Sequence, residues 1–268
     1  MLAPNIDPVL VALGPIQIRW YGLMYVIGFL IAGFLLKILV KEGFFRVAKE
    51  KVDAIITYAL VFMFVGARLA YVFIYNWDYY QDNLSELFSV WKGGLSFHGA
   101  IMGMAFGVFL FARKNKIPFL QATDAAVISG TQGVFFGRMG NFINHELWGR
   151  VTDVPWGMVF TNAGPYPRHP SQLYEGITEG IILFAILWFS RKRFTIYGQA
   201  TAVFFFVYAI FRFVVEFFRE PDSQLGYYLG GMLTMGQILC ILQMFLGVAV
   251  FLYAKKKAAT LTIVRASS

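Results

Sequence analysis

The chain has 268 residues, of which 58% are hydrophobic and only 14% are charged, and its mean hydropathy is +0.62. An ordinary soluble domain is about 45–50% apolar and about 25% charged. The composition therefore excludes a disordered chain, a coiled coil, a collagen-like repeat and an ordinary cytosolic enzyme, and it predicts an integral membrane protein. Lys and Arg exceed Asp and Glu by a net charge of +8, and the single cysteine, Cys240, excludes an internal disulfide and a thiolate metal cluster.

Seven stretches have the roughly 20 mostly apolar residues that a spanning helix needs. They cover residues 20–38, 55–75, 95–112, 123–143, 172–190, 198–217 and 234–254. Glycines and polar residues interrupt the fourth stretch. The first 19 residues lack the basic start of a signal peptide and carry Asn5 and Asp7. We therefore expect an all-α membrane protein with seven transmembrane helices, formed as a single domain over residues 1–268.

Charge alternates between the connections. Basic residues cluster after the first, third, fifth and seventh stretches, in residues 37–51, 113–116, 191–193 and 255–257. The connection over residues 76–92 is instead mainly acidic. Because cytoplasmic connections are enriched in Lys and Arg, we expect the N-terminus outside and the C-terminus in the cytoplasm. Short basic clusters beside membrane helices are typical of contacts with anionic lipid headgroups, so nucleic acid is not an expected partner.

The outward connection over residues 144–171 is rich in aromatic residues and prolines. It contains Trp148, Trp156, Tyr166 and four prolines. Connections longer than about 12–15 residues are usually functional or disordered. The rings of Trp and Tyr prefer the membrane interface, so we expect a small ordered cap there.

Three arginines lie inside predicted spans, away from the basic clusters: Arg68, Arg138 and Arg212. Each costs roughly 2.5–3.5 kcal/mol at mid-span on insertion scales, so such residues face the protein interior and suggest a functional site. Tyr208, Arg212 and Glu216 recur every four residues and therefore share one helix face. The alternative is an Arg212–Glu216 pair with a structural role only.

A second polar stripe lies on the fourth predicted span. Arg138 and Asn141 are three residues apart, and Asn144 and Glu146 follow at the outer end. Neighbouring glycines allow close helix packing, but packing does not require Arg, Asn and Glu side chains. Two guanidinium groups suit a phosphate best, because their forked donors match its oxygens. In a membrane, that phosphate would be a lipid headgroup.

Two more candidates lie near the outer ends of spans. His98 lies among glycines, and neutral imidazole is a common proton acceptor near pH 7. A hydrogen-bonded structural histidine is the alternative. Tyr21 begins the first span, where an interfacial belt tyrosine is also a plausible interpretation. The histidines lack helical metal-ligand spacing, so no metal site is expected.

Five segments together resemble the bacterial phosphatidylglycerol–prolipoprotein diacylglyceryl transferase family. They are RWYGLMY (19–25), GGLSFHGA (93–100), GRMGNFINHELWGR (137–150), RHPSQLYEG (168–176) and FRFVVEFFREPD (211–222). The G-R-x-G-N-F-x-N-x-E-x-x-G pattern is long and specific. The sequence departs from the family at Ala100, where a second glycine is more common.

The resemblance implies an enzyme that transfers the diacylglyceryl group of phosphatidylglycerol to the lipobox cysteine thiol of a preprolipoprotein. This is the first step of lipoprotein maturation, and it forms a thioether and releases glycerol 1-phosphate without a metal or other cofactor. The implied location is the bacterial inner membrane, with the active site toward the periplasm, and we expect a monomer. From the residues alone, a transporter or channel and a non-catalytic lipid-binding scaffold remain alternatives.

The resemblance also assigns site residues. It places the family's catalytic positions on Tyr21, His98, Arg138 and Arg212. It implies phosphatidylglycerol binding by both arginines and by further residues of the two polar stripes and the outer connection. These further residues are Asn141, Glu146, Gly149, Tyr208 and Glu216.

Overall fold

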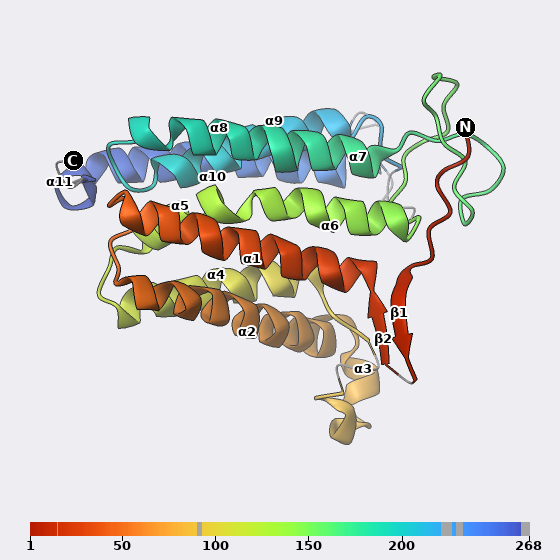
Figure 1. The fold of residues 1–268 in the computed structure, drawn as a ribbon, viewed down its shortest axis with the longest axis horizontal. Coiled ribbons are helices and arrows are strands. Elements are labelled where there is room, and N and C mark those ends of the chain that lie inside the picture. The colour runs from red at the N-terminus through yellow and green to blue at the C-terminus, as the bar shows by residue number, and fades with distance from the viewer. Residues whose placement is uncertain (15, 90–92, 221–226, 229–232, 264–268) are drawn as a thin grey trace. The chain divides into compact units, whose positions relative to one another are not determined.

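The computed structural model describes residues 1–14, 16–89, 93–220, 227–228 and 233–263, and it is mostly helical (Figure 1). The chain divides into two compact units. Unit 1 comprises Met1–Leu35 and Ala126–Ile263, and unit 2 comprises Leu36–Ala125. The long helices of both units are apolar, as the composition predicts.

Helices occupy all seven predicted stretches. They are α1 (Trp20–Lys41), α2 (Val52–Ala70) with η2 (Tyr71–Tyr75), α4 (Phe97–Lys114), α5 (Phe119–Gly130) with α6 (Gln132–Ile143), α7 (Ser171–Glu175) with η5 (Gly176–Ile182) and α8 (Leu183–Ser190), α9 (Gln199–Val215), and α10 (Met235–Lys256). Short helical turns are η1 (Lys49–Lys51), α3 (Trp77–Tyr80), η3 (Leu84–Glu86), η6 (Arg191–Arg193) and α11 (Ala258–Leu261).

Four helical stretches of the described chain are long and apolar enough to cross a membrane. They are Trp20–Lys41, Lys49–Tyr75, Ser171–Arg193 and Met235–Lys256, and α9 is a shorter apolar helix. The chain is therefore a mostly helical, multi-pass membrane protein. The count of seven spans stays a prediction.

Two features depart from seven continuous helices. The predicted span 123–143 is two helices, α5 and α6, which meet at Thr131. The Thr131 hydroxyl donates a hydrogen bond to the Val127 carbonyl, and such local side-chain bonds compete with regular helix geometry. Gly130, the residue before Thr131, ends α5. The all-α prediction is also incomplete, because two short antiparallel hairpins form. They are β1 (Val9–Leu13) with β2 (Ile16–Arg19), and β3 (Tyr227–Tyr228) with β4 (Leu233–Thr234).

In unit 2, glycines hold α2 and α4 together. Gly99, Gly103 and Gly107 follow one another at four-residue intervals on α4 and therefore share a face. A Cβ atom at Gly103 would overlap the Phe62 carbonyl of α2, and one at Gly107 would overlap the Tyr58 carbonyl. Small residues let membrane helices approach at the backbone, where dispersion contacts replace the hydrophobic effect that lipid does not supply.

In unit 1, α6 packs between α1 and the continuous helix formed by α7, η5 and α8 (Figure 1). A Cβ atom at Gly28 of α1 would lie 3.4 Å from the Gly133 Cα atom, and the Gln132 side chain donates a 2.8 Å hydrogen bond to the Gly28 carbonyl. On the other side, Gly180 of η5 lies directly against the Phe135 backbone. This packing places the polar stripe of α6 inside unit 1.

The connection over residues 144–171 is ordered by backbone bridges rather than by helices. Arg168 pairs with both Val151 and Met158, and Leu2 of the N-terminal segment pairs with Val159. Phe160 is fully buried in a small apolar cluster with Ala3 and Phe142. The connection is thereby attached to the C-terminal end of α6.

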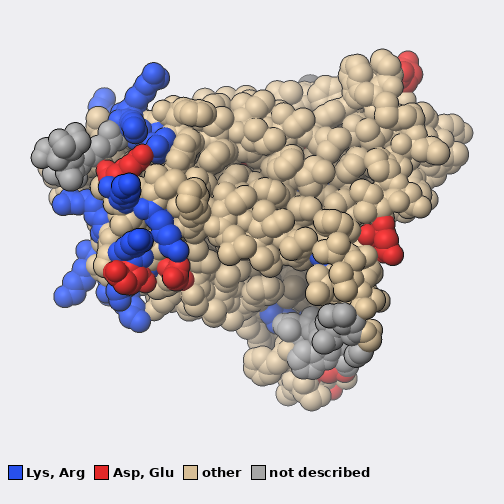
Figure 2. Space-filling model, viewed as in Figure 1, with Lys and Arg blue, Asp and Glu red and all other residues tan. Residues whose placement is uncertain are grey.

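Lys and Arg side chains gather at helix ends, and the long helical surfaces in the same view are almost free of charge (Figure 2). In unit 1, the cluster Arg191–Arg193 follows α8, and Lys255 and Lys256 end α10. In unit 2, Arg113 and Lys114 end α4. This segregation is what a helix surface that contacts hydrocarbon requires.

We expect Gly103→Ala to destabilise unit 2, because the added methyl group has no space against the Phe62 carbonyl. Overpacking of this kind typically costs about 1–3 kcal/mol. The thermal unfolding midpoint of the purified protein in detergent measures the effect. Gly130→Ala is the matched control, since its Cβ atom would meet nothing within 4 Å. Equal midpoints for the two variants would show that the close contact at Gly103 does not contribute to the stability of the protein.

Candidate active site

The two arginines of the polar stripes meet at one carboxylate, Glu175. The Arg138 Nη2 atom lies 2.6 Å from Glu175 Oε2, and the Arg212 Nη1 atom lies 3.0 Å from Glu175 Oε1. The three residues come from α6, α9 and the end of α7. The Glu175 side chain is 0% exposed, so both ion pairs are shielded from water. The structure thus brings together the two guanidinium groups that the sequence analysis places around one anion.

Arg212 contacts two further carboxylates. Its Nη2 atom lies 2.9 Å from Glu216 Oε2, and its Nη1 atom lies 3.9 Å from Glu179 Oε1. Glu216 accepts a 3.0 Å hydrogen bond from the Thr234 hydroxyl, and Thr234 caps the N-terminus of α10. The Arg212–Glu216 pair therefore exists, but it is one part of a larger network and does not neutralise Arg212 in isolation.

A chain of side-chain hydrogen bonds runs from Arg138 toward the connection over residues 144–171. Arg138 Nη1 donates to Asn141 Oδ1 at 3.4 Å, and Asn141 Nδ2 donates to Glu146 Oε2 at 3.3 Å. Asn144 donates to the other oxygen of Glu146 at 3.3 Å. The Gln172 side-chain amide donates a 2.6 Å hydrogen bond to the backbone carbonyl of Glu146. The amide of Asn141 thus links the guanidinium group to a carboxylate with both of its polar atoms.

Two tyrosines border this network. The Tyr21 ring packs on Gly140, where a Cβ atom would lie 2.6 Å from the ring, and its hydroxyl lies 3.1 Å from that of Tyr25. Tyr21 interacts electrostatically with Glu146 and Arg138. Tyr208 of α9 interacts in the same way with Glu179 and both arginines. Each tyrosine can therefore offer a hydroxyl to an anion held by the arginines.

Gly149 has a packing role in the structure. Its N–H donates a 2.9 Å hydrogen bond to the His169 carbonyl, and a Cβ atom there would overlap the Phe218 carbonyl. Arg168 donates to the Gly149 carbonyl at 3.1 Å and pairs with Glu220 at 2.9 Å. Burial lowers the pKa of His169, which favours its neutral form. Direct binding of a ligand by Gly149 stays a prediction.

His98 and Arg68 belong to unit 2. The His98 Nδ1 atom lies 3.3 Å from the Tyr75 hydroxyl, and the histidine side chain is exposed in the first turn of α4. Arg68 is buried, and its guanidinium group donates to four backbone carbonyls at 2.8–3.1 Å, those of Glu86, Leu87, Gly93 and Gly94. Four carbonyl bonds satisfy this intramembrane cation, so it organises the connection before α4. A role of His98 as a base stays a prediction.

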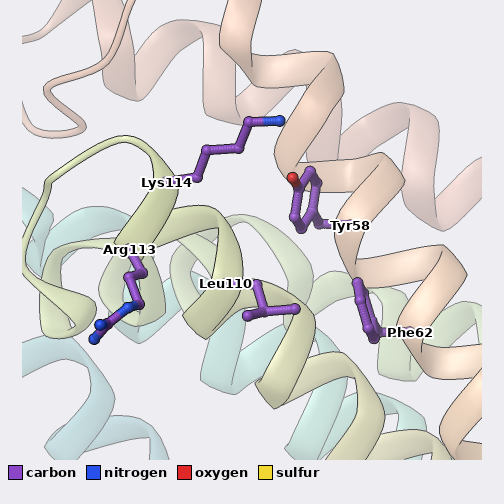
Figure 3. A pocket seen from close by; sticks show the side chains of 5 residues that line it. All are labelled: Tyr58, Phe62, Leu110, Arg113 and Lys114. Atoms are coloured by element: carbon purple, nitrogen blue, oxygen red, sulfur yellow. The ribbon is translucent and has the colours of Figure 1, made fainter.

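A shallow groove of about 440 Å³ lies between α2 and α4 of unit 2, lined by Tyr58, Phe62, Leu110, Arg113 and Lys114 (Figure 3). None of the candidate site residues lines it. In the described part of the chain, no group of three or more His, Cys, Asp or Glu side chains is arranged to hold a metal ion.

The sequence analysis missed two members of the cluster, Glu175 and Glu179. Both are acidic residues inside the predicted span 172–190, and both are 0% exposed. The rule applied to the arginines, that an ionisable side chain inside a span suggests a site, would have found them. Their four-residue spacing also places them on one helix face.

Comparison with known proteins identifies relatives over nearly the whole chain. The sequence profile of the family described as prolipoprotein diacylglyceryl transferase matches residues 8–253. A phosphatidylglycerol–prolipoprotein diacylglyceryl transferase of Nitratidesulfovibrio vulgaris (strain DP4) is 49% identical over 246 residues, covering 91% of this chain and 93% of the relative. Proteins of the same name from Vibrio parahaemolyticus and Pseudomonas aeruginosa (strain LESB58) are 46% and 45% identical. They cover 95% and 96% of this chain, and 93% and 96% of their own lengths.

We expect Arg68→Lys to loosen the connection between α2 and α4. The lysine ammonium group carries its three N–H donors on a single nitrogen. It cannot replace the planar guanidinium group, whose three nitrogens reach four carbonyls. The loss should be about 1–3 kcal/mol, since partly buried carbonyls lose their donors. Limited proteolysis of residues 76–94 in detergent measures it, with exposed Arg113→Lys as the control. Equal cleavage rates in the two variants would argue against an organising role.

Proposed function

The chain belongs to the prolipoprotein diacylglyceryl transferase family, and on that premise we propose that Arg138 and Arg212 bind the phosphate of phosphatidylglycerol during transfer. Enzymes of this family carry out the first step of lipoprotein maturation. One observation carries the proposal: two guanidinium groups from different helices already share a single buried anion, the carboxylate of Glu175. A phosphodiester oxygen pair offers the same negative charge to the same forked donors.

The reaction makes one carbon–sulfur bond and breaks one carbon–oxygen bond. The lipobox cysteine loses its proton, because the thiolate is the nucleophile and a free thiol has a pKa of about 8.5. The thiolate attacks the carbon of the diacylglycerol unit that is bonded to the phosphate oxygen. That carbon–oxygen bond breaks, and glycerol 1-phosphate leaves with the electron pair. Negative charge grows on the departing phosphate, so two arginines stabilise the transition state more than the ground state.

In this proposal Glu175 is the counter-ion of the resting enzyme. The phosphate takes over its contacts with Arg138 and Arg212, which are 2.6 and 3.0 Å long before the lipid arrives. Glu216 and Asn141 keep the guanidinium groups in position during the exchange, because each contacts an arginine from outside the shared carboxylate. The guanidinium groups are therefore already oriented toward the position that the incoming anion takes.

Other residues of the network would complete the headgroup site. Tyr21 and Tyr208 can donate their hydroxyl groups to the phosphate or the glycerol moiety. Glu146 orients Asn141 through a 3.3 Å hydrogen bond. Gly149 keeps the outer connection in contact with the end of α9, which bounds the site. His98 is the proposed base that removes the thiol proton, and it requires no metal or other cofactor.

The proposed topology has seven spans, an N-terminus outside and a C-terminus in the cytoplasm. The basic clusters at the ends of α4, α8 and α10 support it, since these ends would face the cytoplasm. Residues 144–171 would then form a periplasmic cap, and Glu146 would place the site toward the periplasmic side of the inner membrane. The proposed substrates are phosphatidylglycerol and preprolipoprotein signal peptides, and a monomer suffices for this arrangement.

Incubation of the purified protein with phosphatidylglycerol and a synthetic lipobox peptide tests the function directly. Mass spectrometry should show one diacylglyceryl group added to the peptide. A peptide with serine in place of cysteine, and vesicles of phosphatidylcholine in place of phosphatidylglycerol, are the controls. A product that forms equally well from phosphatidylcholine would contradict recognition of the glycerol phosphate headgroup.

We expect Arg138→Lys to lower turnover in this assay by about 10²–10³-fold, the usual effect of removing one transition-state donor. Lysine keeps the charge but loses the fork that engages two oxygens at once. Arg191→Lys, in the basic cluster after α8, is the matched control and should transfer at the rate of the unmodified enzyme. Unchanged turnover in Arg138→Lys would rule out bidentate recognition by this residue.

We expect His98→Gln to bind phosphatidylglycerol but to lose transfer, because glutamine can hydrogen-bond but cannot accept the thiol proton. Lipid retention by native mass spectrometry and the peptide assay separate the two effects. Raising the pH should partly restore transfer in this variant, since the thiol then ionises without a base. Full transfer at neutral pH would refute the assignment of His98 as the base.

A further inference from the structure

The buried cluster holds more carboxylates than cations. Arg138 and Arg212 carry two positive charges, and Glu175 and Glu216 balance them through ion pairs of 2.6–3.0 Å. Glu179 is a third carboxylate, and its ion-pair distance to Arg212 is 3.9 Å. If it were ionised, the cluster would carry one excess negative charge before any lipid bound.

Glu179 is held away from water by the geometry of its helix. It lies in η5, a π-helical segment, and its side chain is 0% exposed. π-helical turns recur at functional sites. Gly176 and Gly180 flank it and bring η5 against α6, where a Cβ atom at Gly176 would lie 3.4 Å from the Arg138 Cβ atom. The Glu179 carboxyl group therefore faces the arginine cluster and not the surface.

The groups that interact with Glu179 come from every helix around it. Glu175 ends α7, Arg138 lies on α6, Tyr208 and Arg212 lie on α9, and Cys240 lies on α10. Arg212 already has closer partners in Glu175 and Glu216. Two buried carboxylates at successive helical turns disfavour each other's ionised forms, and an uncompensated buried charge costs several kcal/mol.

We propose that Glu179 carries a proton in the resting enzyme and donates a hydrogen bond to the phosphate when the phosphate displaces Glu175 from the two arginines. With this proton, the two arginines balance Glu175 and Glu216, so the occupied site carries only the single negative charge of the headgroup. The proton is taken up from the solvent and forms one carboxyl O–H bond, and no bond between heavier atoms changes. This inference rests on the proposed lipid-binding function of the cluster.

The first test measures the proton itself. Infrared spectroscopy of the purified enzyme should show the carbonyl stretch of a buried protonated carboxylic acid at neutral pH. The band should vanish in Glu179→Gln and persist in Glu220→Gln, the same acid-to-amide change at a partly exposed carboxylate outside the cluster. Absence of the band from the unmodified enzyme at neutral pH would overturn the proposal, whether or not the variants fold.

The second test measures the binding of a short-chain phosphatidylglycerol without peptide, so that neither the thiol nor the transfer step contributes. Once rising pH ionises Glu179, affinity should fall by about tenfold per pH unit in the unmodified enzyme. Glu179→Gln, which resembles the neutral acid, should abolish this fall. A fall that persists unchanged in Glu179→Gln would overturn the proposal. An enzyme that shows the infrared band but binds no lipid would instead contradict the proposed function and leave the protonation of Glu179 standing.

Discussion

The sharing of one buried carboxylate by two guanidinium groups constrains the whole of unit 1. Charges removed from water are tolerated only when they are paired or fully hydrogen-bonded. The arrangement of α6, α9 and the end of α7 therefore has to bring Arg138, Arg212 and Glu175 into contact. Glu216 extends the constraint to α10, because its second oxygen accepts from the capping Thr234. The polar network therefore fixes which faces of four apolar helical elements point inward, a choice that apolar packing in lipid specifies only weakly.

Close backbone packing makes this network possible. Gly140 admits the Tyr21 ring, and Gly176 and Gly180 bring the π-helical segment against α6. Without a side chain at these positions, the helix axes come close enough for short ion pairs between side chains of ordinary length. The small residues thus set the distance between helices, and the buried charges set the rotation of each helix about its own axis.

Arg68 shows that an intramembrane arginine is not by itself a ligand-binding residue. It is the same residue type as Arg138 and, like Arg138, lies inside a predicted span. Yet its donors are occupied by backbone carbonyls of the connection before α4, whereas those of Arg138 face a carboxylate. The difference lies in the acceptor. Carbonyls are fixed parts of the chain, while a carboxylate can release a guanidinium group to a competing anion.

The sequence by itself determined the membrane class, the positions of the helices and the two polar stripes, because hydrophobic run length and four-residue spacing are local properties. Its resemblance to one family indicated the activity that the comparisons support. Only the tertiary structure showed that Glu175 joins the stripes, that Glu179 completes the cluster and that backbone carbonyls satisfy Arg68. These features depend on which helix faces which, and that is decided by contacts between residues tens of positions apart, which no local period encodes.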